Sequence, residues 1–207
     1  MNLNVNEIFY SLQGEGGRMG EASIFIRLTK CNLACDFCDT DFAEGKEMSI
    51  SEILDEIRSF CCRWIVWTGG EPTLQLTDEI VSFFKKNGYF QAIETNGTRN
   101  VPAGIDYIAC SPKHNPVIER SRNAVIERSR NAVKNFIPEV DELRFPMQKG
   151  DLLPDISILP KAKRYLLSPV FEGQNIVREN IDHCVELIKQ NPQWALSLQM
   201  HKLIDIQ

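Results

Sequence analysis

The chain has 207 residues, of which 43% are hydrophobic and 25% charged, as in a globular protein with a substantial core. Its formal net charge of −5 argues against a broad nucleic-acid-binding surface, and no apolar run approaches the roughly 18 residues of a membrane span. Because no basic and apolar leader opens the chain, we expect a soluble, cytoplasmic protein with one domain over residues 1–207.

The first half of the chain alternates strand and helix patterns. Ala22–Leu28 is a β-branched and apolar run that predicts a strand, and residues 64–68 predict another. Residues 49–60 open with the serine and glutamate spacing of a capping box, which predicts a helix. A second helix is expected from residue 77, with the Asn-Gly pair at 87–88 as its stop.

The second half continues the alternation. A third helix is expected over residues 175–190, where apolar residues recur with helical spacing and Ile176 falls on the buried side. Further strands are predicted at 90–94, Tyr107–Cys110, 142–145, 164–167 and 195–198. Strands that alternate with helices imply an α/β fold with a parallel sheet, in which functional loops gather at the carboxyl ends of the strands.

Residues 117–132 hold two identical copies of the octapeptide VIERSRNA. Two copies are too few and too short for a solenoid. Each copy is locally basic, so binding of nucleic acid or of a partner is one interpretation. We predict instead an exposed insertion, as a loop or a short helix without a catalytic part, because loops accept extra length at small entropic cost.

Three cysteines crowd into one loop after the first predicted strand. Cys31, Cys35 and Cys38 have the spacing CxxxCxxC. Three thiolates can bind three irons of a [4Fe–4S] cubane and leave the fourth iron without a protein ligand. That open position suits S-adenosylmethionine (SAM), whose amino and carboxylate groups can chelate iron. Reductive cleavage of the sulfonium would then release a 5′-deoxyadenosyl radical, with the protein supplying position and exclusion of water.

Structural zinc and an electron-transfer cluster without SAM chemistry are the alternatives for these cysteines. Zinc usually takes four Cys or His ligands, and no second Cys-x-x-Cys occurs in the sequence. An odd total of seven cysteines argues against a disulfide framework. We predict that Cys61, Cys62, Cys110 and Cys184 are buried as small hydrophobic residues. A fourth zinc ligand would have to come from Cys61, Cys62, Cys110, His114, His183 or His201, at no zinc-like spacing.

Taken with its surroundings, the cysteine motif resembles the radical SAM superfamily. Phe37 precedes the last cysteine, and Gly-Gly-Glu-Pro at 69–72 follows the second predicted strand. The runs at 94–97 and 111–113 resemble later loops of the superfamily that face SAM. The resemblance implies an incomplete (β/α) barrel with trimmed helices, in which 69–72 binds the amino group of SAM. Glu71 is expected to meet that ammonium charge.

The remaining motifs resemble the 7-carboxy-7-deazaguanine synthase family over nearly the whole chain apart from the repeat. They are IFYSLQGEG at 8–16, Arg27, Cys-Asp-Thr at 38–40, TGGEP at 68–72, Ser-Pro-Lys at 111–113 and LSLQMHK at 196–202. The resemblance implies a lyase that converts 6-carboxy-5,6,7,8-tetrahydropterin to 7-carboxy-7-deazaguanine with release of ammonia, on the route to queuosine or related deazapurines. SAM is regenerated there. A homodimer and an electron donor such as flavodoxin or ferredoxin are also implied.

The same resemblance assigns roles to individual residues. Thr40 would bind Mg²⁺, which assists by coordinating the substrate carboxylate. The substrate would be bound by Leu12, Gln13, Gly14, Arg27, Thr68 and Gln207, with Arg27 paired to the carboxylate. SAM would be bound by Phe37, Cys38, Asp39, Gly70, Ser111, Pro112, Lys113, Ser168, Pro169, Val170 and Phe171. Ser168 stands where the family has glutamine, and Gln207 is alternatively a frayed, exposed tail.

Two other functions remain open from the sequence. A radical SAM activase that makes a glycyl radical on a partner protein would often carry further cysteine clusters, and none is readable here. A non-enzymatic metal-binding module would have a closed site with four protein ligands and no dependence on SAM.

Overall fold

The computed structural model describes residues 1–35, 44–112 and 137–207, and the repeat at 117–132 lies outside them. The described strands form one nine-stranded sheet in the order β3-β1-β2-β4-β5-β6-β7-β8-β9. The strands are β1 (Asn2–Leu12), β2 (Ala22–Leu28), β3 (Lys46–Ser49), β4 (Trp64–Gly69), β5 (Phe90–Thr95), β6 (Tyr107–Cys110), β7 (Glu139–Met147), β8 (Lys161–Pro169) and β9 (Trp194–Leu196). All seven predicted strands are present.

The sheet is parallel from β2 to β9, as predicted, but β1 and β3 extend it in antiparallel pairing. Neither of these two strands was predicted. Asn2, Asn4, Asn6 and Glu7 are weak strand formers, and the short polar–apolar alternation at residues 2–6 ends where the register shifts between Val5 and Glu7. The strand forms because Leu3 and Val5 are buried and because its backbone pairs with two neighbours.

Four α-helices follow strands in the described chain, at α1 (Ile50–Ile57), α2 (Asp78–Lys86), α4 (Arg178–Gln190) and α5 (Met200–Leu203). Three short 3-10 turns accompany them, at η1 (Gly16–Arg18), η2 (Pro72–Leu74) and η3 (Ile156–Ile158). The capping box is confirmed, since the Ser49 hydroxyl accepts from the Glu52 amide and the Glu52 carboxylate accepts from the Ser49 amide. Helix α4 begins three residues later than predicted, which leaves Ile176 51% exposed instead of buried.

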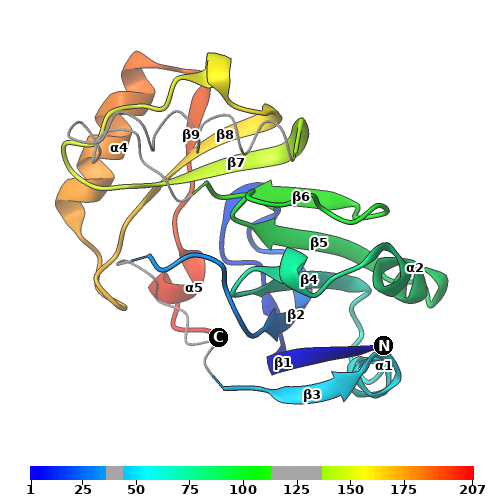
Figure 1. Ribbon diagram of the computed structural model, residues 1–207. Coiled ribbons are helices and arrows are strands. Elements are labelled where there is room, and N and C mark those ends of the chain that lie inside the picture. The colour runs from blue at the N-terminus through cyan, green and yellow to red at the C-terminus, as the bar shows by residue number, and fades with distance from the viewer. Residues whose placement is uncertain (36–43, 113–136) are drawn as a thin grey trace.

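The main core lies between the helices and one face of the sheet (Figure 1). Ile57 of α1 and Phe84 of α2 pack there with Ile26 and Trp67 of the strands, and Cys184 of α4 belongs to a second cluster. Burial raises the pKa of the Cys184 thiol to about 12, so it stays protonated. Cys110 is also buried as predicted.

The prediction of burial is wrong for the other two cysteines of that group. Cys61 is exposed and Cys62 is half-buried, because both lie in the connection between α1 and β4. No helix in the described parts of the chain is long and apolar enough to cross a membrane.

Hydrogen bonds join the segment after β9, the last strand of the sheet, to the loop after β1, the strand next to the other end. The Met200 amide, just beyond β9, donates to the Gly14 carbonyl just beyond β1 at 2.8 Å. The Gly16 amide donates to the Ser197 hydroxyl at 2.9 Å. A sheet that curls in this way and has few helices is the incomplete barrel that the sequence predicted.

Candidate active site

The inner face of the barrel collects polar side chains at the carboxyl ends of its strands. Successive residues of a strand point to opposite faces. Ile26 and Trp67 face the helices, so Arg27 and Thr68 face the interior of the barrel, and they are paired in the register of β2 with β4. Glu94 occupies the same face of β5. Strand alternation therefore places these three residues together, although they are far apart in the sequence.

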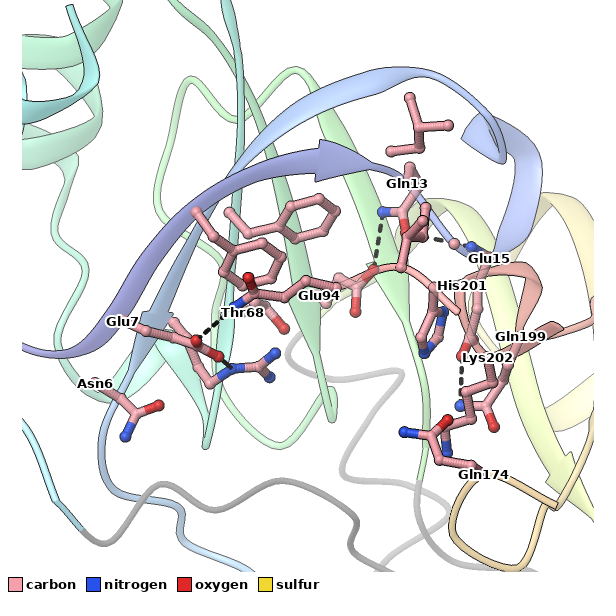
Figure 2. A pocket seen from close by; sticks show the side chains of 17 residues that line it. Asn6, Glu7, Gln13, Glu15, Thr68, Glu94, Gln174, Gln199, His201 and Lys202 are labelled. Carbon is pink, nitrogen blue, oxygen red and sulfur yellow. Dashed lines mark hydrogen bonds and ion pairs between the residues drawn. The ribbon is translucent and has the colours of Figure 1, made fainter. Parts of the chain in front are cut away.

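A cavity of about 530 Å³, called here the arginine cavity, opens over this face (Figure 2). All six residues predicted to bind substrate line it, namely Leu12, Gln13, Gly14, Arg27, Thr68 and Gln207. Glu7, Glu15, Gln199, His201 and Lys202 also line it and were not assigned a ligand from the family resemblance, and Glu94, from the run at 94–97 expected to face SAM, lines it as well. The run at 8–16 and the closing run at 196–202 were the signals that could have found most of them.

Arg27 is held by one end of its guanidinium group. Its Nε donates to Glu7 Oε1 at 2.7 Å, and the group lies 5.7 Å from the ring centre of Phe9. Within the described parts of the chain, no hydrogen bond engages its two terminal nitrogens. These nitrogens can therefore receive a carboxylate in the cavity.

The carboxyl-terminal segment forms one wall of the arginine cavity. The Gln207 carbonyl accepts from the Ser11 hydroxyl at 2.5 Å, and its side-chain amide donates to Glu7 Oε2 at 2.9 Å. Glycine fits at position 14 because a β-carbon there would overlap the His201 ring. Gln207 is exposed, as the alternative interpretation held, but these bonds fix it beside the cavity.

A second cavity of about 510 Å³, called here the cysteine cavity, adjoins the first. Cys31 and Cys35 line it together with Gly70, Ser111, Ser168, Pro169, Val170 and Phe171, which were predicted to bind SAM. Five residues line both cavities and form a shared wall: Glu15, Thr68, Glu94, Gln199 and Lys202.

Not every predicted residue is found at the cysteine cavity. Pro112 is buried and does not line it, because the proline packs into the protein at the exit of β6. Phe37, Cys38, Asp39, Thr40 and Lys113 lie outside the described residues. Their roles stay predictions.

The side chains around Cys31 and Cys35 fit a cluster whose fourth iron has no protein ligand better than they fit zinc. Cys31 Sγ accepts a bond from the Leu33 amide at 3.4 Å, the kind of contact that tunes cluster thiolates. Of the candidate fourth zinc ligands in the described chain, Cys61, Cys62, Cys110 and His183 do not line the cavity, and His201 lines only the neighbouring one.

A polar ligand is also expected beside the cysteines. The Ser168 hydroxyl lines the cysteine cavity, is buried, and has no hydrogen-bond partner among the described residues. Buried polar atoms are nearly always paired. An unpaired hydroxyl at this place fits a ligand such as SAM.

Glu71 does not meet a ligand, and the sequence-based expectation for it is wrong. Its carboxylate is 0% exposed and is filled by protein donors. It accepts from the Thr73 amide at 3.0 Å, the Thr73 hydroxyl at 2.6 Å, the Thr95 hydroxyl at 2.8 Å and the Asn96 amide at 2.7 Å. Glu71 therefore joins the loop after β4 to the loop after β5, on two sides of the cysteine cavity.

Replacing Glu71 with glutamine is expected to lower the free energy of unfolding by about 1–3 kcal/mol, because the amide nitrogen cannot accept and leaves a buried donor unpaired. Denaturant unfolding measures the change. Glu186→Gln on the exposed side of α4 is the matched control and should stay within about 0.5 kcal/mol of the native chain. Equal losses in the two variants would contradict the role given to Glu71.

Arg144 of β7 carries a charge network that the sequence analysis missed. It is 6% exposed, and its guanidinium lies 2.8 Å from Glu15, 2.9 Å from Glu94 and 3.1 Å from Glu142. Burial works against its positive charge, but the three facing carboxylates outweigh burial and raise its pKa. No local pattern singles out Arg144, because Glu139, Asp141, Glu142 and Arg144 place charges on both faces of β7.

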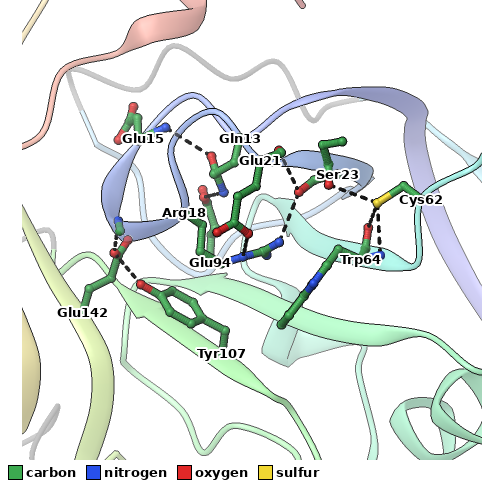
Figure 3. Close-up of polar contacts among 12 residues, drawn as sticks. Gln13, Glu15, Arg18, Glu21, Ser23, Cys62, Trp64, Glu94, Tyr107 and Glu142 are labelled. Atoms are coloured by element: carbon green, nitrogen blue, oxygen red, sulfur yellow. Dashed lines mark hydrogen bonds and ion pairs between the residues drawn. The ribbon is translucent and has the colours of Figure 1, made fainter.

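Side chains around Arg18 pack together at the amino-terminal end of β4 and β6 (Figure 3). The Arg18 guanidinium lies 3.8 Å from the ring centre of Trp64 and is paired with Glu21. Glu142 accepts from the Tyr107 hydroxyl at 2.8 Å, and burial together with this carboxylate raises the pKa of Tyr107. Trp64 and Tyr107 begin β4 and β6, so this end lies away from the two cavities.

Comparisons with known proteins agree with this geometry. The Radical SAM superfamily matches residues 25–140. The 7-carboxy-7-deazaguanine synthase of Haemophilus influenzae is 42% identical over 214 residues, which cover 100% of this chain and 95% of the relative. The chain belongs to the 7-carboxy-7-deazaguanine synthase family. The synthase of Bacteroides thetaiotaomicron is 37% identical over 206 residues, covering 100% of both chains.

A crystal structure of QueE from Escherichia coli supports the fold. It superposes with a TM-score of 0.69 at 24% identity, covering 97% of this chain and 95% of that one. As a member of the 7-carboxy-7-deazaguanine synthase family, the chain is a radical SAM enzyme, and its superfamily implies a [4Fe–4S] cluster and SAM. This membership decides against the activase and the non-enzymatic module.

Proposed function

We propose that the chain converts 6-carboxy-5,6,7,8-tetrahydropterin to 7-carboxy-7-deazaguanine with release of ammonia, within queuosine or deazapurine biosynthesis. The supporting observation is the shared wall between the arginine and cysteine cavities. The [4Fe–4S] cluster and SAM, when bound, supply a 5′-deoxyadenosyl radical that takes hydrogen from carbon. Side-by-side cavities would let this step occur without passage through solvent.

Each cavity has side chains suited to its ligand. Cys31 and Cys35, with Cys38, would hold the cluster, and the Ser168 hydroxyl would bond to SAM. In the arginine cavity, Arg27 would bind the substrate carboxylate through its two terminal nitrogens. Backbone groups of the segment Leu12, Gln13 and Gly14 would read the donor and acceptor edge of the flat ring. Thr68 stands in the shared wall, where it would contact the substrate.

The resemblance to the family supports several further parts of the proposal. Thr40 would bind Mg²⁺ beside the cluster, since it follows Cys38 closely. The enzyme would act as a homodimer in the cytoplasm and take electrons from a flavodoxin or ferredoxin. SAM would act catalytically and be regenerated in each turnover.

Anaerobic reconstitution tests the proposal. We expect about four irons per chain, release of 5′-deoxyadenosine only with SAM and reductant, and formation of the deazaguanine and ammonia from the carboxy-tetrahydropterin. Omission of Mg²⁺ should lower the rate. Cleavage of SAM while the pterin stays unchanged would refute the proposed reaction and leave the superfamily assignment standing.

A further inference from the structure

We propose that Arg144 is a positioning residue that fixes the shared wall and thereby sets how the substrate lies against SAM. The inference rests on the proposed function. Arg144 lines the cysteine cavity and not the arginine cavity. Its two terminal nitrogens pair with Glu15 and Glu94 of the shared wall. Its Nε lies 3.1 Å from Glu142 but makes no hydrogen bond among the described residues. The positive charge is therefore held by protein carboxylates, two of which belong to the wall.

The guanidinium group joins segments that are remote in the sequence. Its Nη1 pairs with Glu15 in the loop after β1, and its Nη2 pairs with Glu94 near the end of β5. The contacts extend to the neighbours of these carboxylates. Gln199 donates to Glu15 Oε1 at 2.8 Å, and Gln13 donates to Glu94 Oε1 at 3.0 Å, as Figure 2 shows. One cation therefore organises both the shared wall and the adjoining edge of the arginine cavity.

Arginine is the side chain that this arrangement requires. Its rigid planar fork can hold two carboxylates in different directions, whereas lysine is a compact point charge on a flexible stem. Three carboxylates, those of Glu15, Glu94 and Glu142, face this one guanidinium. Without the fork, the carboxylates would repel one another at short range and the wall would lose its fixed geometry.

Loss of Arg144 should disturb the alignment of the substrate and not the assembly of the cluster. Glu15 and Glu94 line both cavities, so their displacement would shift the pterin relative to the carbon radical. Small misplacements cost large factors in rate because reacting atoms must be close and aligned. The ion pairs of Arg144 in the described chain are with Glu15, Glu94 and Glu142 and not with the cysteine loop, so cluster assembly should survive its replacement.

Arg144→Lys and Arg144→Gln test the inference in the reconstituted holoenzyme. Arg178→Gln, which removes an exposed arginine paired with Asp182, is the matched control. The readouts are iron content, the dissociation constant for SAM, the dissociation constant for the pterin measured without reductant, and the 5′-deoxyadenosine released per product. The pterin measurement requires no turnover.

In Arg144→Lys we expect the pterin to bind about tenfold more weakly and 5′-deoxyadenosine per product to rise about fivefold, because misaligned substrate leaves the radical unused. Iron content and SAM affinity should match the control. Unchanged pterin affinity and coupling would overturn the inference, as would unfolding of both variants or a parallel loss of iron and SAM. If Arg144→Gln alone fails to fold, Arg144→Lys decides. A native enzyme that cleaves SAM but never converts the pterin would instead refute the proposed function.

Discussion

Gly70→Ala is expected to remove most of the iron from the reconstituted protein. A β-carbon at Gly70 would overlap the Lys30 carbonyl oxygen and lie 3.0 Å from the Cys31 amide nitrogen. The loop after β4 and the cysteine loop are also joined by a hydrogen bond, which the Glu71 amide donates to the Lys30 carbonyl at 2.9 Å. The cysteine loop would have to move as a unit. Overpacking of this kind costs about 1–3 kcal/mol, which converts to a loss of cluster occupancy of at least about fivefold.

Iron analysis and the absorbance of the cluster measure this effect. Gly88→Ala is the matched control, because Gly88 also ends an element but a β-carbon there would meet nothing within 4 Å. Its φ of +84° makes alanine unfavourable there, so it tests whether backbone strain alone lowers iron content. Full iron content in Gly70→Ala would show that the close approach does not position the cysteines.

Arg27→Ala is expected to raise the KM for the carboxy-tetrahydropterin at least about thirtyfold, since removing one partner of a buried charge pair costs about 2 kcal/mol or more. The loss should fall on substrate binding because Arg27 lines only the arginine cavity. Iron content and release of 5′-deoxyadenosine without substrate should stay at native values. Steady-state kinetics and iron analysis together separate the two effects.

Two further variants sharpen the test of Arg27. Arg27→Lys retains the charge but not the bidentate fork, and we expect it to recover only part of the affinity. Arg63→Ala removes an exposed arginine that contacts Tyr89 away from both cavities, and it should leave KM unchanged. An unaltered KM in Arg27→Ala would remove its proposed role.

Local patterns predicted much of the fold. β-branched runs located seven strands, and the capping box located the start of α1, because both signals depend on neighbours in the sequence. β1 was missed because asparagine and glutamate are weak strand formers and its alternation is interrupted after Asn6, and its stability comes from pairing with β2 and β3. The start of α4 was predicted too early because the apolar residues Ile176 and Val177 lie before Arg178, where the chain becomes helical.

The residues of the candidate site that belong to short sequence motifs could be predicted from the sequence. CxxxCxxC identifies a cluster loop, and IFYSLQGEG with Arg27 identifies residues that line the arginine cavity. The expected contact between Glu71 and an ammonium group was wrong because the motif does not reveal which donors surround a carboxylate. Four protein hydrogen bonds fill it. A buried arginine such as Arg144 has no motif at all.

The sequence by itself indicated the cofactor chemistry and the alternation of seven strands with three helices, because thiol spacing and hydrophobic periodicity are properties of short segments. Only the tertiary structure decided which charges meet. Glu15, Glu94 and Arg144 lie on separate segments and become partners when strand register and curvature bring them to one wall. Gln207 likewise lines the arginine cavity because of a long-range contact. Its carbonyl accepts a hydrogen bond from Ser11, which is 196 residues away in the sequence.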